Sequence, residues 1–222
     1  MTRIFKTHNQ RRGRHLRKSM RVMLPALLLS MAAGVVYTTS PSNAYEKIVN
    51  EKEPRPTPWI IKGCEIKPKT VCHNADFRHA DLAQANLAGA DLRGAKFARA
   101  DMRGINLTGA DLSGADLESA DLRVSKLIKT KLVGASLRGA NLEFSRTASA
   151  DMSYADLTAA NFEAVKAYKS IFVGAKIINA NFSETKLYYA NLSNARMEGT
   201  KITFAIFQGA FMEGCVGCPH NW

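Results

Sequence analysis

One periodicity constrains this chain more than any other feature: large, mostly apolar residues recur every five positions from Phe77 to Met212, without a break in register. The residue two places before each of them is small, usually alanine. An α-helix cannot bury this pattern, because five steps of about 100° place successive large residues about 140° apart. In an extended segment, residues two apart point the same way, so both members of a pentad can face inward. The pattern therefore predicts a chain that turns once in every pentad.

The remaining positions of the pentad indicate how the chain turns. Glycine occupies 11 of the 28 second turn positions, where a type II turn requires a positive φ. Asp or Asn occupies 15 of the 28 outward positions, and these short side chains can accept hydrogen bonds from nearby backbone N–H groups. Four pentads would close a square coil of about 20 residues, and coils stacked about 4.8 Å apart would pair their backbones.

The segments ADLRGA, ADLSGADL and ANLAGADL resemble the A(D/N)LxX signature of the pentapeptide-repeat family, and the resemblance covers residues 75–214. It implies an all-β fold, a right-handed quadrilateral parallel β-helix. The 28 pentads would form about seven coils, in a rod about 34 Å long. Some members of the family mimic DNA and inhibit DNA gyrase through acidic surfaces on a cytosolic dimer. No inhibitor residue is carried over from those members to this chain.

The N-terminal region, residues 1–44, has the composition of an export signal. It contains eight basic residues and no acidic one, an apolar run at Val22–Val36, and the small-residue segment Ser42–Ala44. We expect a signal peptide cleaved after Ala44. An uncleaved anchor helix is the alternative, although the apolar run is shorter than the roughly 20 residues of a membrane span. The expected location is a bacterial periplasm or the extracellular space, with a photosynthetic lumen as the alternative.

Two short segments flank the repeat and are predicted to cap it. Residues 45–58 are predicted to be a charged, proline-containing linker, and residues 59–74 an N-terminal cap in which Trp59, Ile60 and Ile61 cover the first coil. Residues 215–222 form the predicted C-terminal cap and tail. Apolar residues at outward positions near this end would be covered by the tail or form a homodimer contact. They are Ile171, Val173, Ile206 and Phe211.

Four cysteines in an exported chain favour disulfide bonds. Cysteines at opposite ends of such a rod are too far apart to pair, because the Cα atoms of a disulfide lie within about 7 Å. The prediction is therefore Cys64–Cys72 and Cys215–Cys218. A redox role for the second pair is an alternative. A zinc site there would lack a fourth ligand, so no metal and no cofactor are expected.

The twenty-residue register sorts the outward residues onto four faces. On the first face, neighbouring coils carry opposite charges such as Asp76 and Lys96, which suggests ion pairs between coils. The second face begins with aspartates and continues as a ladder of asparagines. The third face is basic with tyrosines, and it is the candidate binding face. It consists of Lys126, Lys129, Arg146, Lys166, Tyr168, Lys169, Lys186, Tyr188 and Tyr189. A solvated face whose tyrosines shield the coil edges is the alternative.

No nucleophile–base pair or convergent carboxylates stand out in the sequence, so no catalytic residue is assigned. The expected function is a non-enzymatic, exported scaffold that binds a protein or an anionic envelope polymer. We expect no nucleic-acid partner, and membrane contact only through the N-terminal segment during export. The alternatives are a gyrase inhibitor of the DNA-mimic type and a CxxC thiol–disulfide protein. The interior raises one further question, because the pentad around Ser145 and Thr147 is polar; we expect a bulge or a water-filled spot there.

Overall fold

The computed structural model describes residues 55–219 of the chain. The predicted signal peptide, residues 45–54 of the predicted linker and the last three residues of the predicted tail lie outside the described residues. Within this part of the chain, no helix has the length and the hydropathy that crossing a membrane requires.

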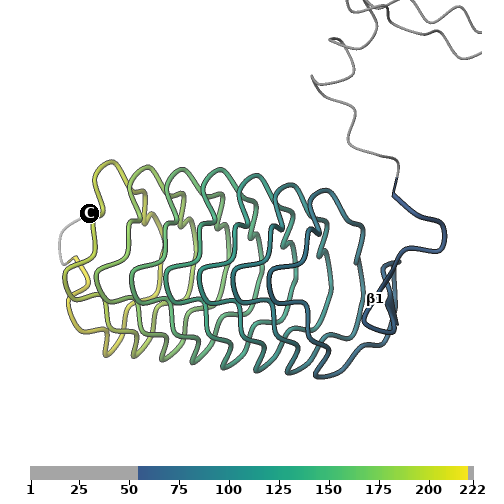
Figure 1. Ribbon diagram of the computed structural model, residues 1–222. Coiled ribbons are helices and arrows are strands. Elements are labelled where there is room, and N and C mark those ends of the chain that lie inside the picture. The colour runs from purple at the N-terminus through teal and green to yellow at the C-terminus, as the bar shows by residue number, and fades with distance from the viewer. Residues whose placement is uncertain (1–54, 220–222) are drawn as a thin grey trace, which may run out of the picture. The chain divides into compact units, whose positions relative to one another are not determined.

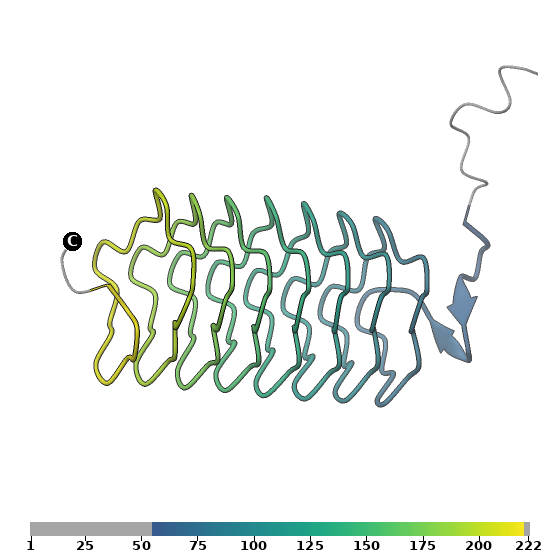
Figure 2. The same cartoon turned by 60° about the vertical axis from the view of Figure 1, so that its left-hand side comes forward.

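The described part begins with a small hairpin at the N-terminal end of the coils (Figure 2). Strand β1 (Ile60–Ile61) pairs antiparallel with strand β2 (Cys64–Glu65). Trp59 and Ile61 pack against the core as predicted. Ile60 does not, because strand residues alternate between faces, and its side chain is 55% exposed.

The repeat winds into stacked coils (Figure 1). Residues twenty apart form parallel bridges from Val71↔Asp91 to Arg196↔Val216. The Leu117 N–H donates to the Ser136 carbonyl at 2.7 Å, and the Ala115 N–H donates to Leu112 at 3.0 Å, which closes the turn between two pentads. Only one residue of each pentad is bridged, so the coils contain isolated bridges instead of regular strands. The twenty-residue register predicted from the sequence is confirmed.

The core contains the two inward positions of each pentad. Most of the large residues and most of the alanines two places before them are buried. Phenylalanine rings also pack between coils, with Phe162 and Phe182 stacked at 4.6 Å. The polar pentad does not bulge, because Arg146 is bridged to both neighbouring coils and Thr147 is fully buried. The Ser170 hydroxyl donates to the Thr147 carbonyl at 2.6 Å.

The turns confirm the expected roles of glycine and of the outward Asp and Asn residues. All 28 second turn positions have a positive φ, whether they are occupied by glycine or by another residue such as Val124 (φ 59°). All 15 outward Asp and Asn residues accept a hydrogen bond from the backbone N–H two residues later, at 3.0–3.5 Å.

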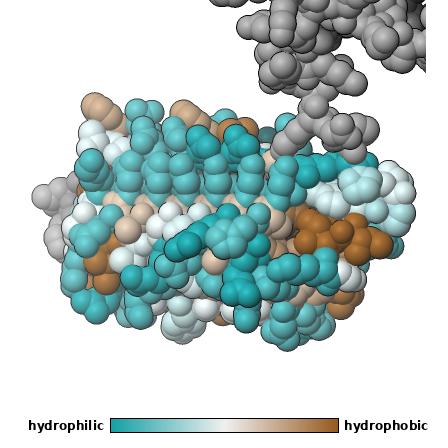
Figure 3. All heavy atoms as spheres, viewed as in Figure 1, coloured by the Kyte–Doolittle hydropathy of each residue, from teal (hydrophilic) through white to brown (hydrophobic). Residues whose placement is uncertain are grey.

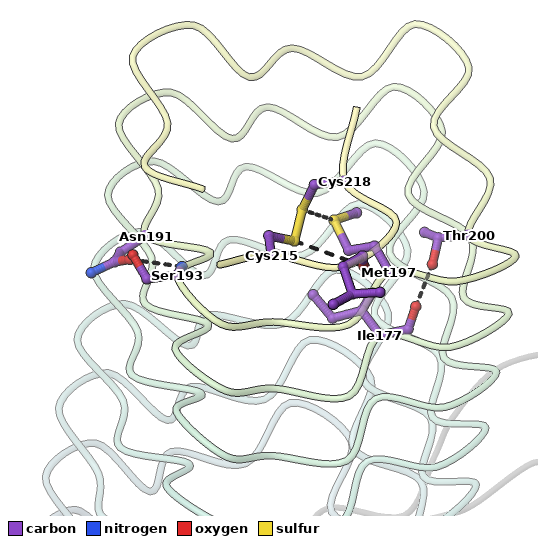
Figure 4. The surroundings of a disulfide bond; sticks show 8 residues. Ile177, Asn191, Ser193, Met197, Thr200, Cys215 and Cys218 are labelled. Carbon is purple, nitrogen blue, oxygen red and sulfur yellow. Dashed lines mark hydrogen bonds between the residues drawn. A yellow bond between two sulfur atoms is a disulfide. The ribbon is translucent and has the colours of Figure 1, made fainter. Parts of the chain in front are cut away.

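Both predicted disulfides are present. Cys64–Cys72 ties strand β2 to the start of the first coil, with a Cα–Cα distance of 5.9 Å. Cys215–Cys218 lies at the other end (Figure 4), where the Cys218 Sγ packs 3.3 Å from the Met197 Sδ. The C-terminal segment up to Pro219 does not cover Phe211, which is 62% exposed.

Candidate functional site

The predicted binding face is built around four cations at outward positions on consecutive coils. They form the basic column, which consists of Lys126, Arg146, Lys166 and Lys186. Parallel bridges join each of them to the next. Lys126, Arg146 and Lys166 are exposed, and Lys186 is half-buried. The winding therefore places four like charges in a single row, one on each coil.

The turn positions beside the column carry the remaining residues of the predicted face. Tyr168 and Tyr188 stack with their ring centroids 5.5 Å apart, so the two rings contact each other across neighbouring coils. Lys129, Lys169 and Tyr189 occupy second turn positions with φ of 55–57°. Tyr189 is 56% exposed. The structure thus brings the nine predicted residues together on one face, and two of its three tyrosines stack on each other.

The cations of this face have no acidic partner within residues 55–219: no carboxylate oxygen lies within 4.0 Å of any of them. Like charges in a row repel one another, and no ion pair offsets that repulsion here. A surface of this kind attracts anions, because it raises the local potential along one line.

Elsewhere in the coils, four ion pairs follow a local rule that the sequence analysis missed. Arginine two residues after an outward aspartate pairs with it, as in Arg78–Asp76 at 2.8 Å and Arg103–Asp101 at 2.6 Å. The spacing Asp-x-Arg was the available signal. The hydrogen bonds from Arg78 and Lys62 lower the pKa of Asp76 below its usual range. Arg93 and then His73 lower the pKa of Asp91 in the same way.

The expected ion pairs between outward residues of adjacent coils on the first face are wrong. Within the described residues, Lys96 has no ion-pair partner, and Asp76 binds Arg78 and Lys62 instead. The side chain two positions away lies on the same turn and reaches the carboxylate directly. The asparagine ladder of the second face is confirmed: the Asn181 Nδ2 donates to the Asn161 Oδ1 at 3.1 Å.

The surface in Figure 3 reflects this organisation, since hydrophilic side chains form rows along the stacked coils. The same view shows an apolar patch at the N-terminal end. Among the large apolar residues of the first part of the described chain, Ile60 and Val71 are exposed. No group of three or more His, Cys, Asp or Glu side chains within residues 55–219 could hold a metal ion. The arrangement can offer charge, hydrogen-bond donors and aromatic edges to a ligand.

Comparison with protein families gave a match to "Pentapeptide repeats (8 copies)" at residues 70–109, 105–143, 148–183 and 180–216. Among solved structures, a pentapeptide repeat protein from Nostoc PCC 7120 is 35% identical over 44% of this chain and 70% of that protein, with a TM-score of 0.23. One from the thylakoid lumen of Arabidopsis thaliana is 26% identical over 49% and 68%, with a TM-score of 0.36. QnrB1, a plasmid-mediated fluoroquinolone resistance protein, is 21% identical over 67% and 80%, with a TM-score of 0.43. Curated protein sequences gave no match.

Proposed function

Because this chain belongs to the pentapeptide-repeat family, we propose that it is a non-enzymatic, exported scaffold whose third face binds a protein or an anionic ligand. The proposal takes the coil as right-handed, with about seven turns in residues 75–214, and takes residues 1–44 as a cleaved signal peptide. The mature chain would then carry 23 basic and 19 acidic residues outside the cytoplasm.

The observation that carries this proposal is that the basic column forms no ion pair with any residue that the structure describes. Asp76, Asp91, Asp101 and Asp121 each have an arginine partner on their own turn. Lys126, Arg146, Lys166 and Lys186 have no acidic partner within residues 55–219. A rigid coil holds these charges in place, so a partner with complementary charge does not need to order them on binding.

Gyrase inhibition by DNA mimicry would need a surface of uncompensated negative charge. The three aspartates that begin the second face are Asp81, Asp101 and Asp121. They are paired with Arg55 at 2.8 Å, Arg103 at 2.6 Å and Arg123 at 2.6 Å. These arginines neutralise the most acidic part of the coil, which favours the scaffold over the DNA mimic. A supercoiling assay with DNA gyrase separates the two functions, and we expect no inhibition.

The experiment that tests the proposal is cross-linking of the protein in its native envelope. We compare the unchanged chain with a Lys166→Glu/Lys186→Glu variant and a matched control, Lys96→Glu/Lys176→Glu on the first face. Lys96 and Lys176 are exposed, and they have no ion pair within the described residues. We expect the unchanged chain and the control to form the same cross-link, and the third-face variant to lose it. An unchanged cross-link in all three chains would overturn the proposal.

A further inference from the structure

The backbone N–H of the first turn residue is a recurring donor on the outer surface of the coil. In each of the 15 pentads with an outward Asp or Asn, the Oδ1 of that residue accepts this hydrogen bond. At Asp156, for example, the Thr158 N–H donates to Oδ1 at 3.0 Å. The outward carboxylate or amide thus satisfies a donor that the coil itself leaves unpaired.

The basic column lacks this acceptor, because lysine and arginine side chains carry only donors. The corresponding N–H groups have no acceptor within residues 55–219. They belong to Ile128, Ala148, Tyr168 and Tyr188. The adjoining hydrogen bonds between coils are intact, since the Lys169 N–H donates to the Tyr188 carbonyl at 2.8 Å. The backbone therefore presents the same outward donor as elsewhere, now beside a cation.

This combination forms a continuous row only on the third face. Within the described coils, other cations at outward positions either stand alone, as Lys96 does, or form a single adjacent pair, Lys176 and Arg196. On the third face, one N–H and one cation recur on four consecutive coils. Their spacing is the coil spacing of about 4.8 Å. Such a row fits a linear ligand whose anionic groups repeat at that spacing or at a multiple of it.

We propose that the basic column binds an acidic polysaccharide built from uronate sugars, which lies along the stack of coils. This deepens the proposed function and rests on it. Each bound carboxylate takes the place that an Asp or Asn side chain occupies elsewhere, accepting the turn N–H while the lysine or arginine beside it supplies the charge. A uronate polysaccharide carries one carboxylate on each sugar, so anionic groups recur regularly along the length of the ligand.

Two other polyanions fit the face less well. Single-stranded nucleic acid is held by bases stacked on free aromatic faces, whereas Tyr168 and Tyr188 stack on each other and the Tyr189 ring lies against Gly209. An anionic membrane offers a plane of headgroups, but the basic column is one residue wide, and only two of the four adjoining second turn positions are cationic, Lys129 and Lys169. The acidic residues Glu143 and Glu163 also lie on the preceding turns. A single linear chain of carboxylates is the ligand that matches the row.

The test separates the turn N–H from simple charge attraction. Lys166→Gln/Lys186→Gln removes two charges but leaves the N–H groups open, because a longer side chain does not form the short turn of Asp and Asn. Lys166→Asn/Lys186→Asn removes the same charges and supplies an internal acceptor. The first-face control is Lys96→Asn/Lys176→Asn. The probe is a polygalacturonate oligomer, measured by calorimetry at low salt, with methyl-esterified polygalacturonate as the neutral comparison.

We expect the unchanged chain and the first-face control to bind polygalacturonate equally, and the methyl ester not to bind. The Gln variant should bind several-fold more weakly. The Asn variant should bind at least about tenfold more weakly still, since it also loses hydrogen bonds to a charged group. Its melting temperature should not fall, because each asparagine adds a turn hydrogen bond, so the loss of binding is separate from unfolding.

Equal affinities of the Gln and Asn variants would overturn the role of the turn N–H groups. Binding of the methyl ester, or a preference for single-stranded DNA or anionic vesicles over polygalacturonate, would overturn the uronate ligand. A protein cross-linked through the third face, with no binding of polygalacturonate, would overturn this inference and leave the proposed function standing. If the third face gave neither a cross-link nor polygalacturonate binding, the face would have no functional role.

Discussion

The backbone conformation of a residue in this chain is set by its position in the pentad and not by the intrinsic preference of its side chain. Alanine, leucine and arginine favour helices, yet the described repeat contains no helix. Val124 is β-branched and still adopts a φ of 59° in a second turn position. The inward packing and the bonds between coils fix the backbone, and the residue adapts to it. Two predictions follow from this hierarchy, one for the core and one for the turns.

The first concerns Leu117, which is fully buried. Leu117→Lys places a charge in the core without a partner, so we expect it to lower the free energy of unfolding by at least about 4 kcal/mol. Thermal melting followed by circular dichroism measures this. The control is Glu118→Lys on the adjacent exposed position, which should change stability by no more than about 0.5 kcal/mol. A Leu117→Lys protein with an unchanged melting curve would contradict the inward position of this residue.

The second concerns Val124, whose side chain is 63% exposed and gains little from packing. A left-handed conformation costs a β-branched residue roughly 1–2 kcal/mol, whereas asparagine tolerates it. We therefore expect Val124→Asn to raise the free energy of unfolding by about 1 kcal/mol. The matched control is Val133→Asn, at a first turn position without a positive φ. Stabilisation of the control but not of Val124→Asn would contradict the strain at this turn.

At the scale of the turn, the Asp-x-Arg pairs make stability depend on pH. The hydrogen bonds from Arg78 and Arg93 lower the pKa values of Asp76 and Asp91 relative to an unfolded value of about 3.9. Because the folded pKa is the lower one, these pairs stabilise the protein above about pH 4, and the contribution is lost as the pH falls further. We expect a constant melting temperature from pH 7 to about 5 and a progressive fall below about 4.

The control for this prediction is Arg78→Gln/Arg93→Gln, which removes the arginine partners of Asp76 and Asp91. Its melting temperature should fall less steeply in acid than that of the unchanged chain. Identical acid profiles would show that these pairs do not contribute to stability.

The hairpin at the N-terminal end is the element that depends most on a covalent link. Cys64 is buried against the core, and its bond to Cys72 closes a short loop. Cys64→Ala/Cys72→Ala should lower the free energy of unfolding by about 2–3 kcal/mol. Cys215→Ala/Cys218→Ala removes a disulfide that closes a shorter loop, so it should cost less stability. Melting curves of both variants, with and without a thiol reductant, measure this. Reductant-insensitive melting of the unchanged chain would contradict it.

Much of the architecture could be predicted from the sequence, because it depends on composition at fixed spacing. The inward positions, the twenty-residue register, the turn hydrogen bonds of Asp and Asn, and both disulfides all follow from spacing. The ion pairs do not follow from the pentad pattern. Asp76 has one candidate partner on its own turn, Arg78, and another on the next coil, Lys96, and the pattern does not choose between them. The exposure of Ile60 depends on a hairpin of two-residue strands, which lies outside the repeat and so has no pentad pattern to predict it. The basic column was visible in the register, whereas its open N–H groups required the hydrogen bonds.

At the scale of the whole molecule, every face depends on the winding of twenty residues per coil. The basic column exists only because Lys126, Arg146, Lys166 and Lys186 fall at the same point of successive coils. A solenoid of this kind is stabilised by contacts between neighbouring coils, so it tolerates the removal of one whole repeat. A deletion whose length is not a multiple of five moves large residues away from the core.

The most direct test of this winding is a pair of deletions. Removing residues 145–164 takes out one coil and joins Phe144 to Val165 in register, whereas removing residues 145–162 takes out two residues fewer. We expect the first variant to keep the circular dichroism spectrum and a cooperative melting transition close to that of the unchanged chain. The second should lose several kcal/mol of stability, because its large residues no longer face inward. Equal melting curves for the two deletions would contradict the fixed pentad register on which the winding of the coil depends.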